Sequence, residues 1–395
     1  MSNFPSLDAR ASVRTLVASR IRELVNEGIG NPDVLAFWVG EPDEPTPEFI
    51  RKAGTDAIAA GDTFYTHNLG IPPLREELAS YITRLHRPTV AENIAVTSAG
   101  VNALMLASQL LLDPGDRVVE VTPLWPNLVA IPKILSADVA CVSLRFAREG
   151  WKLDLDELLG ALKPGTKALY INSPNNPTGW TLTRIEQQAI LERCRKFGIW
   201  IFADDAYERL YFGEGSSVAP SFLDIADAQD RVVSANTFSK SWLMTGWRLG
   251  WLVVPETLTA DLGKLIEYNT SCAPGFVQQA GIAAVRHGEP VIARSVERLR
   301  AARDFLVREL NAIPAVEAAL PSGAMYAFLR VDGRSNSPVD SLEFCKRLVR
   351  QTGLGLAPGS AFGPEGEGYV RWCFASSQER LADGVGRLRR ALPAS

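Results

Sequence analysis

Hydrophobic and polar positions follow two different spacings along this chain. Apolar residues recur at helical intervals in four segments, 7–28, 74–86, 100–112 and 183–197. Short and almost continuous apolar runs predict buried strands at 93–97, 117–121, 138–144, 167–171, 199–203, 231–235 and 249–254. Such strands alternating with helices predict an α/β fold, in which helices cover both faces of a mostly parallel sheet.

The pattern changes near residue 290. A long charged helix is predicted over 290–311, and the segment after it has fewer continuous apolar strands. The chain has 395 residues, more than the roughly 100–200 residues of one ordinary domain. We therefore predict a large domain over 46–289 and a smaller α+β domain made of 1–45 and 290–395.

Composition and charge narrow the class of protein. The chain is 46% hydrophobic and 22% charged, as in soluble globular proteins. Its net charge is −4 with no long run of either sign, which gives no basic footprint for nucleic acid. The N-terminus lacks the apolar core of a signal peptide, and no apolar run is long enough to span a bilayer. We expect a cytoplasmic protein with neither a nucleic-acid nor a membrane partner.

Residue types also limit the chemistry. The 5 cysteines are scattered without a CxxC pair, which favours small buried hydrophobes in a reducing compartment over disulfides or a zinc site. There are 3 histidines and no HExxH, GxSxG, GxGxxG or GxxxxGK[ST] motif. Zinc hydrolysis, nucleophile-elbow serine hydrolysis, dinucleotide binding and P-loop chemistry therefore lack their usual motifs. Chemistry in this chain would have to come from residues other than histidine.

Polar or aromatic residues follow five of the predicted strands. In open α/β sheets, ligands bind just beyond the carboxyl ends of the strands. The five segments are SAG (98–100), TPLWPN (122–127), NSPNNPTG (172–179), DDAYERL (204–210) and NTFSK (236–240). Each alone also fits a turn, a helix N-cap or a strand–helix connection. Together they predict one pocket.

In this order the segments resemble a known family, the class I/II aminotransferases of the fold-type I, aspartate aminotransferase-like superfamily, which use pyridoxal 5'-phosphate (PLP). The resemblance covers nearly the whole chain, and its SxxNPTG, DxAY and SK…GxRxG elements are together highly specific. It is carried by WVGEPDEPTP (38–47), FYTHNLGIPPLREE (64–77), VTSAGVNAL (96–104), SPNNPTG (173–179), DDAYERL (204–210), TFSKSWLMTGWRLGW (237–251) and YVRWCFA (369–375). It implies a PLP-dependent transaminase of amino acid metabolism, without a metal.

The resemblance assigns residues to the cofactor ring. It implies that Lys240 forms the Schiff base with PLP and then moves the proton during catalysis. Asp204 matches the carboxylate that keeps the pyridine nitrogen protonated, so that the ring serves as an electron sink. Tyr207 and Asn176 match the residues that contact the 3'-oxygen, and Trp125 matches the aromatic that stacks on the ring. Asp205 would point to the other face of its strand and is expected to be structural.

The resemblance also implies a phosphate site. Its donors would be the backbone amides that open a helix, two hydroxyls and one guanidinium. These groups belong to Ala99, Gly100, Val101, Thr237, Ser239 and Arg248. Ala99 stands where a glycine is commoner in the family, which should matter little because only its amide is needed.

Substrate binding is implied at four positions, with a fifth open. Arg371 matches the arginine that binds the substrate α-carboxylate bidentately, and the backbone of Gly40 faces the same group. Trp125 and Asn176 would border the substrate as well as the cofactor. Trp38 either walls the substrate side-chain pocket or belongs to the core.

Tyr65 matches a tyrosine that reaches the phosphate of the other subunit. The resemblance therefore implies a homodimer with shared active sites.

The substrate class depends on a departure from part of the family. Members that select acidic amino acids place a lysine just after the phosphate-binding glycine, where this chain has Val101. This favours a neutral, aliphatic or aromatic L-amino acid as donor and a 2-oxo acid such as 2-oxoglutarate or pyruvate as acceptor. An aspartate-type aminotransferase stays open, since another arginine could take the lysine's role. So does a PLP-dependent lyase, such as a carbon–sulfur β-lyase or a cyclopropane-forming lyase. A non-catalytic DNA-binding regulator is disfavoured, because no basic helix-turn-helix segment precedes the pattern.

Overall fold

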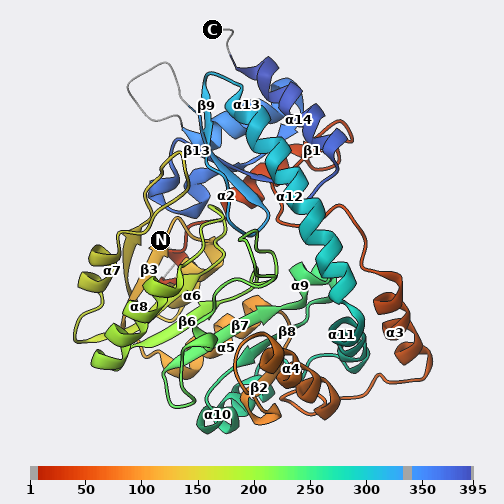
Figure 1. Ribbon diagram of the computed structural model, residues 1–395, viewed down its shortest axis with the longest axis vertical. Coiled ribbons are helices and arrows are strands. Elements are labelled where there is room, and N and C mark those ends of the chain that lie inside the picture. The colour runs from red at the N-terminus through yellow and green to blue at the C-terminus, as the bar shows by residue number, and fades with distance from the viewer. Residues whose placement is uncertain (1–7, 332–339, 393–395) are drawn as a thin grey trace, which may run out of the picture.

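The computed structural model describes residues 8–331 and 340–392, and a seven-stranded sheet forms its centre (Figure 1). Within this sheet β8 runs antiparallel to both of its neighbours, and the other strands are parallel to one another. The order across the sheet is β2 (Ile94–Thr97), β8 (Gly250–Val253), β7 (Val232–Thr237), β6 (Trp200–Asp204), β5 (Thr166–Asn172), β3 (Arg117–Thr122) and β4 (Asp138–Ser143). The predicted α/β fold with a mostly parallel sheet is confirmed.

Helices cover both faces of this sheet, as the continuous apolar strands predict. Leu169 and Ile171 of β5 pack on one face, whereas Ala168 and Tyr170 pack on the other, because successive side chains of a strand point to opposite sides. The first face carries α4 (Pro72–Leu85), α7 (Leu155–Ala161), α8 (Arg184–Phe197) and α11 (Gly275–His287), with α3 (Glu48–Ala59) packed on α11. The second carries α5 (Gly100–Leu111), α6 (Pro126–Ile134) and α10 (Glu256–Glu267).

A smaller antiparallel sheet lies at the other end of the molecule (Figure 1). Its strands, in order, are β12 (Ala357–Pro358), β13 (Tyr369–Cys373), β10 (Tyr326–Val331) and β9 (Val316–Ala318). The helices near it are α2 (Arg20–Gly28), α12 (Glu289–Asn311), α13 (Ser341–Thr352) and α14 (Gln378–Ala391). The long α12 extends from α11 to this sheet and so links the two parts of the fold.

The N-terminal segment joins the C-terminal part of the chain. The short strand β1 (Leu35–Ala36) pairs in parallel with β11 (Leu354–Gly355). This pairing supports the assignment of the first residues to the smaller domain, although the boundaries at 46–289 and at 1–45 with 290–395 stay a prediction. Residues 1–7, 332–339 and 393–395 of those ranges lie outside the described part of the chain.

The prediction of one helix over 7–28 is wrong, and its first residue lies outside the described part. Two helices occupy the segment, α1 (Ala11–Arg14) and α2, and the residues between them are not helical. The reason is a new helix start at Ser19, whose hydroxyl accepts a hydrogen bond from the backbone N–H of Arg22. Arg10, at the start of α1, donates to the carbonyl of Ile134 at 3.0 Å, so this segment contacts the end of α6.

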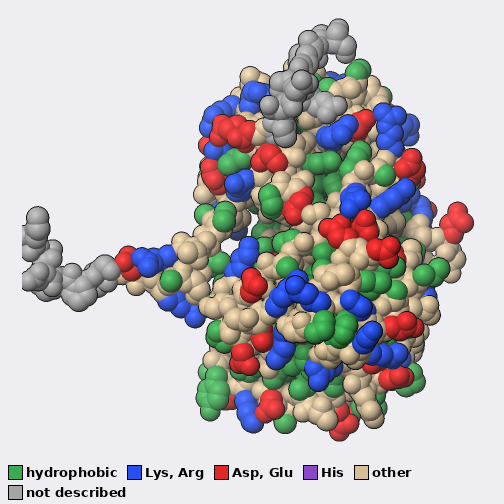
Figure 2. All heavy atoms as spheres, turned by 90° about the vertical axis from the view of Figure 1, so that its left-hand side faces the viewer, with side chains coloured by type: hydrophobic (Ala, Val, Ile, Leu, Met, Phe, Trp, Pro, Cys, Tyr) green, Lys and Arg blue, Asp and Glu red, His purple; other side chains and the backbone are tan. Residues whose placement is uncertain are grey.

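The surface and the cysteines complete the picture. Figure 2 shows basic and acidic side chains mixed over one face of the molecule. No helix in the described ranges has both the length and the apolar character needed to cross a membrane. All five cysteines are free thiols, and Cys194, Cys345 and Cys373 are buried as expected. Cys141 is exposed, because it lies on the edge strand β4, so the prediction of burial is wrong for that residue.

Candidate active site

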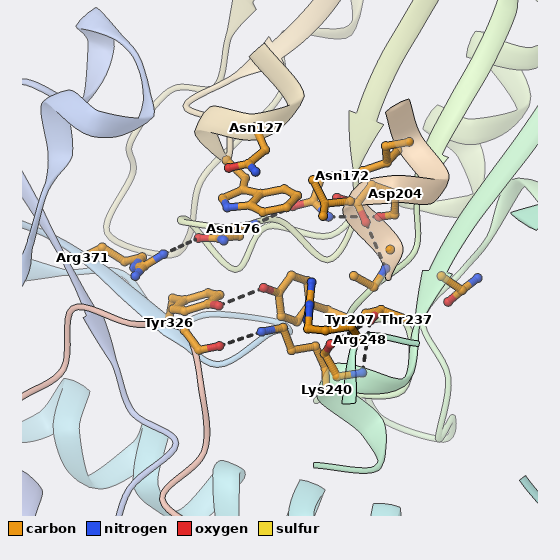
Figure 3. A pocket seen from close by; sticks show the side chains of 18 residues that line it. Asn127, Asn172, Asn176, Asp204, Tyr207, Thr237, Lys240, Arg248, Tyr326 and Arg371 are labelled. Carbon is orange, nitrogen blue, oxygen red and sulfur yellow. Dashed lines mark hydrogen bonds between the residues drawn. The ribbon is translucent and has the colours of Figure 1, made fainter. Parts of the chain in front are cut away.

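A pocket of about 310 Å³ opens at the carboxyl ends of the central strands (Figure 3). All five polar segments that follow those strands contribute to it, so the structure brings together what the sequence predicts as one site. The predicted residues that line it are Gly40, Gly100, Val101, Trp125, Asn176, Asp204, Tyr207, Thr237, Ser239, Lys240, Arg248 and Arg371. Sequence reasoning missed Leu104, Asn127, Asn172, Ala206, Asn236 and Tyr326.

Lys240 lies on the short helix α9 (Phe238–Ser241), directly after β7. The aromatic residues around it form core rather than pocket: Phe238 stacks 4.9 Å from Trp242, and both contact Trp251, at ring-centroid distances of 5.1 and 6.1 Å. Ring pairs of this kind contribute about 0.5–1.5 kcal/mol each beyond their burial. The aromatic residues therefore anchor α9 and fix the position from which the lysine extends.

The chain then reverses to enter β8. The backbone N–H of Phe238 donates to the carbonyl of Leu249 at 3.0 Å, which closes the loop that contains Lys240. The connection contains only the four-residue α9 and a 3-10 turn at Thr245–Trp247, and no helix long enough to cross the sheet to a parallel strand. This explains why β8 is antiparallel and why Lys240 stays at the carboxyl end of β7.

The amine of Lys240 is mostly buried and has a single hydrogen bond within the described ranges. Its Nζ donates to the carbonyl oxygen of Gly40 at 2.6 Å (Figure 3). Burial lowers the pKa of Lys240 to about 8, and the positive charges of Arg371 and Arg248 contribute in the same direction. An amine with this pKa has a substantial neutral fraction near pH 8, which suits a nucleophile and a proton carrier.

Asp204 ends strand β6 with its carboxyl group buried in the pocket. Burial raises the pKa of Asp204 to about 7, while the N–H of Ala206 and the charge of Lys240 partly offset that effect. Asn172 donates to the backbone carbonyl of Asp204 at 2.9 Å. A buried carboxyl group in this state gains from a cationic partner, because an adjacent positive charge stabilises its ionised form.

Asp205 points away from the pocket, as the alternation of the strand predicts. Its carboxylate accepts hydrogen bonds from the hydroxyls of Ser234 at 2.6 Å and Ser221 at 3.3 Å. Asp205 does not line the pocket. These contacts support a structural role for it.

Arg371 reaches the pocket from β13 of the smaller sheet. It is buried, and it donates to the side chain of Asn176 at 3.1 Å and to the carbonyl of Trp38. Its guanidinium also stacks on the ring of Tyr326 at 4.5 Å. Its Nε has no hydrogen-bond partner among the described residues, and an unpaired buried donor is costly unless a ligand satisfies it.

Tyr326 is the most informative residue that sequence reasoning missed. It lies on β10, and its hydroxyl is 2.8 Å from that of Tyr207 (Figure 3). A Cβ atom at Gly40 would lie 2.1 Å from the Tyr326 hydroxyl, so only glycine allows this approach. No local motif identifies Tyr326, since pairing between β10 and β13 sets its place beside Arg371.

The opposite end of the pocket is suited to an anion. Helix α5 begins at Gly100, where free N–H groups and the helix dipole favour negative charge. The Thr237 hydroxyl donates to that of Ser239 at 2.9 Å, and Arg248 donates to the carbonyl of Thr245 at 2.7 Å. These groups have donors within reach of one anionic ligand.

Two of the predicted cofactor residues do not line this pocket. Ala99 lies just behind Gly100 with φ of 115° and ψ of 159°, a conformation that glycine alone adopts easily. The prediction that alanine matters little at this position took account of its amide alone, and the strain of this backbone conformation is an additional effect. Tyr65 is 89% exposed and lies outside the pocket of its own chain.

Comparison with known proteins decides the family. Residues 32–388 match the family model of aminotransferase class I and II. The chain is 34% identical to an aspartate aminotransferase of Pyrococcus horikoshii, over 95% of this chain and 94% of that one. It is 32% identical to an arginine–pyruvate transaminase of Pseudomonas aeruginosa, over 90% and 89% of the two chains. The crystal structure of an aspartate aminotransferase from Thermotoga maritima superimposes with a TM-score of 0.87 at 31% identity, over 97% and 99%.

The chain belongs to the class I/II aminotransferases. This aminotransferase is therefore a PLP-dependent enzyme, as the sequence predicts. The residues of the pocket fit that cofactor. They offer a buried amine that donates to a carbonyl, a buried carboxyl group, and a helix start suited to phosphate.

Proposed function

We propose that this aminotransferase moves the amino group of a neutral L-amino acid, aliphatic or aromatic, to a 2-oxo acid such as 2-oxoglutarate or pyruvate. The observation that carries the proposal is the position of Lys240, whose amine lies in the pocket that Asp204 and Arg371 also line. Val101 stands where acid-selecting members of the family have a lysine, and its side chain adds no charge to the pocket. The roles below are part of the proposal.

Bound PLP supplies an electron sink that stabilises negative charge at the substrate α-carbon. In this scheme Lys240 holds the cofactor covalently between turnovers. Once its amine is free, Lys240 would carry a proton between the substrate α-carbon and the cofactor. Its pKa of about 8 allows both directions of transfer near neutral pH.

Asp204 would pair with the pyridine nitrogen, and Tyr207 and Asn176 would contact the 3'-oxygen. Trp125 would stack on the ring, which suits a flat aromatic surface. Arg371 would bind the substrate α-carboxylate, where its unpaired Nε supplies a donor. The amides of Ala99, Gly100 and Val101, with Thr237, Ser239 and Arg248, would bind the phosphate.

We also infer a homodimer in which Tyr65 reaches the phosphate of the partner subunit. Tyr65 and Phe64 are 89% and 82% exposed, an unusual state for adjacent aromatic residues. Mixing the Lys240→Ala variant with Tyr65→Ala tests this, because a mixed dimer contains one complete site. Recovery of activity on mixing supports shared active sites. If the two variants are inactive alone and stay inactive when mixed, shared sites are contradicted.

The absorption spectrum tests the function directly. We expect the visible band of bound PLP to be bleached by neutral L-amino acids and restored by 2-oxoglutarate or pyruvate. Lys240→Ala should abolish turnover and leave the fold unchanged, and Lys163→Ala, an exposed lysine, is the matched control. Full activity in the Lys240 variant would overturn the assignment. Ammonia released without an acceptor would favour a lyase, and aspartate as the best donor would favour the aspartate-type alternative.

A further inference from the structure

A second cavity adjoins the active-site pocket on the side of Arg371. It has a volume of about 210 Å³ and shares Gly40, Trp125, Asn127 and Arg371 with the pocket. Since Arg371 is the proposed α-carboxylate site, a substrate side chain that extends from this end enters the second cavity. We call it the side cavity.

The walls of the side cavity combine apolar and polar side chains. They include Ile21, Val25, Trp38 and Pro126, which would contact an aliphatic or aromatic side chain. Trp38 is buried and also borders the cavity, so its position agrees with both alternatives that the sequence leaves open. The uncharged side chain of a neutral amino donor requires only apolar contacts of this kind for binding.

One basic side chain in the side cavity has no other assignment. Arg22, in the first turn of α2, lines the cavity. Its backbone N–H bonds to Ser19, but no side chain or carbonyl within the described ranges is hydrogen-bonded to its guanidinium. The other cations that line either cavity are Lys240, Arg248 and Arg371, each with a role in the proposed chemistry.

Packing holds helix α2 beside the side cavity. A Cβ atom at Gly28 would lie 2.6 Å from the ring of Trp38, so α2 rests directly on that ring. Glu23 of the same helix forms an ion pair with Lys346 of α13 at 2.8 Å. Helix α2 is therefore held against the cavity, and the exposed Arg22 lies at its border.

We propose that Arg22 binds the distal carboxylate of a five-carbon dicarboxylic 2-oxo acid, the amino acceptor, while the apolar walls of the side cavity contact the neutral donor. The inference rests on the proposed function. It explains how one site accepts two unlike substrates although Val101 replaces the family's lysine. A guanidinium suits the role because its fork pairs with both carboxylate oxygens.

Separate half-reactions test this specificity. In the Arg22→Met variant we expect reamination by 2-oxoglutarate to slow about tenfold to 100-fold in kcat/KM, the range for loss of a charged hydrogen bond. Reamination by pyruvate and bleaching by a neutral L-amino acid should stay unchanged. Arg20→Met removes the same charge from the same helix at a residue that lines neither cavity, so it should change neither reaction. An equal loss with 2-oxoglutarate and pyruvate, or no loss with either, overturns the proposal.

A binding measurement avoids catalysis altogether. Glutarate and butyrate differ in one distal carboxylate, so the rise in Tm that each causes in the cofactor-free protein isolates that group. Glutarate should stabilise the unmodified protein more than butyrate, and Arg22→Met should remove that difference. An undiminished difference in the variant places the carboxylate elsewhere. If neutral amino acids fail to bleach even the unmodified enzyme, the proposed function fails instead.

Discussion

The hydroxyl of Tyr326 lies 2.8 Å from the hydroxyl of Tyr207, across the boundary between the smaller sheet and the central sheet. Tyr326 belongs to β10 and Tyr207 follows β6, so the contact joins the two parts of the fold inside the pocket. The same Tyr326 ring stacks under Arg371. One side chain thus touches both the proposed cofactor contact and the proposed substrate contact.

Tyr326→Phe removes this hydrogen bond with little change in shape. Because the Tyr207 hydroxyl loses its hydrogen-bond partner while keeping its place, we expect kcat/KM to fall about threefold to tenfold, the value of one neutral hydrogen bond. The pH at which the visible band of bound PLP changes should also shift, which a merely structural role would not cause. Tyr268→Phe, on a 90% exposed tyrosine, is the control. An unshifted spectral titration would show that Tyr326 does not act on Tyr207.

Asp204 makes stability depend on pH in the cofactor-free protein. Its pKa is raised from 3.8 to about 7 by burial, so between these values the folded state binds a proton that the unfolded state releases. Stability from this group therefore falls as pH rises from about 4 to above 7. Asp204→Asn removes this pH dependence. In thermal melts, the Tm of the variant relative to that of the unmodified protein should therefore rise between pH 5 and pH 8. A constant difference across that range would contradict the assignment, and Asp56→Asn, on an exposed residue, is the control.

Arg371→Lys keeps the charge but loses the planar fork. We expect about a tenfold to 100-fold loss in kcat/KM for every amino acid tested, since the α-carboxylate is common to all. The lysine also loses the hydrogen bonds that Arg371 makes to Asn176 and to the carbonyl of Trp38. Because these bonds hold the substrate-binding group in place, we expect the change to appear mainly in KM. Arg390→Lys, at the exposed end of α14, is the control. If the loss in kcat/KM instead differs among amino acids with different side chains, Arg371 contacts the substrate side chain and not the α-carboxylate.

Ala99→Gly should stabilise the protein. The backbone of Ala99 has φ of 115° and ψ of 159°, a conformation that costs a side-chain residue about 1–3 kcal/mol. The extra freedom of glycine in the unfolded chain offsets part of that gain, so we expect a net rise of about 1 kcal/mol in the free energy of unfolding. Ala103→Gly, inside helix α5, should destabilise by a similar amount. Destabilisation by both substitutions would contradict the argument from φ.

Sequence periodicity accounts for most of the central sheet. The run 117–121 differs from β3 by one residue at one end, and the run 167–171 differs from β5 by one residue at each end, because an apolar strand bounded by polar residues is a local signal. The prediction of one helix over 7–28 is wrong because apolar spacing continues through the segment, whereas a helix cap at Ser19 starts a new helix within it. The antiparallel direction of β8 follows from the reversal of the chain after α9, which no periodicity contains.

The sequence by itself determined the family, and it identified Lys240, Asp204 and Arg371, because each of these lies in a contiguous motif. Only the tertiary structure decided that Tyr326 meets Tyr207 and that Arg22 borders the side cavity. Those contacts depend on how β10 pairs with β13 and how α2 packs on Trp38. Such contacts are set by the packing of distant segments, and a linear pattern of residues does not record them.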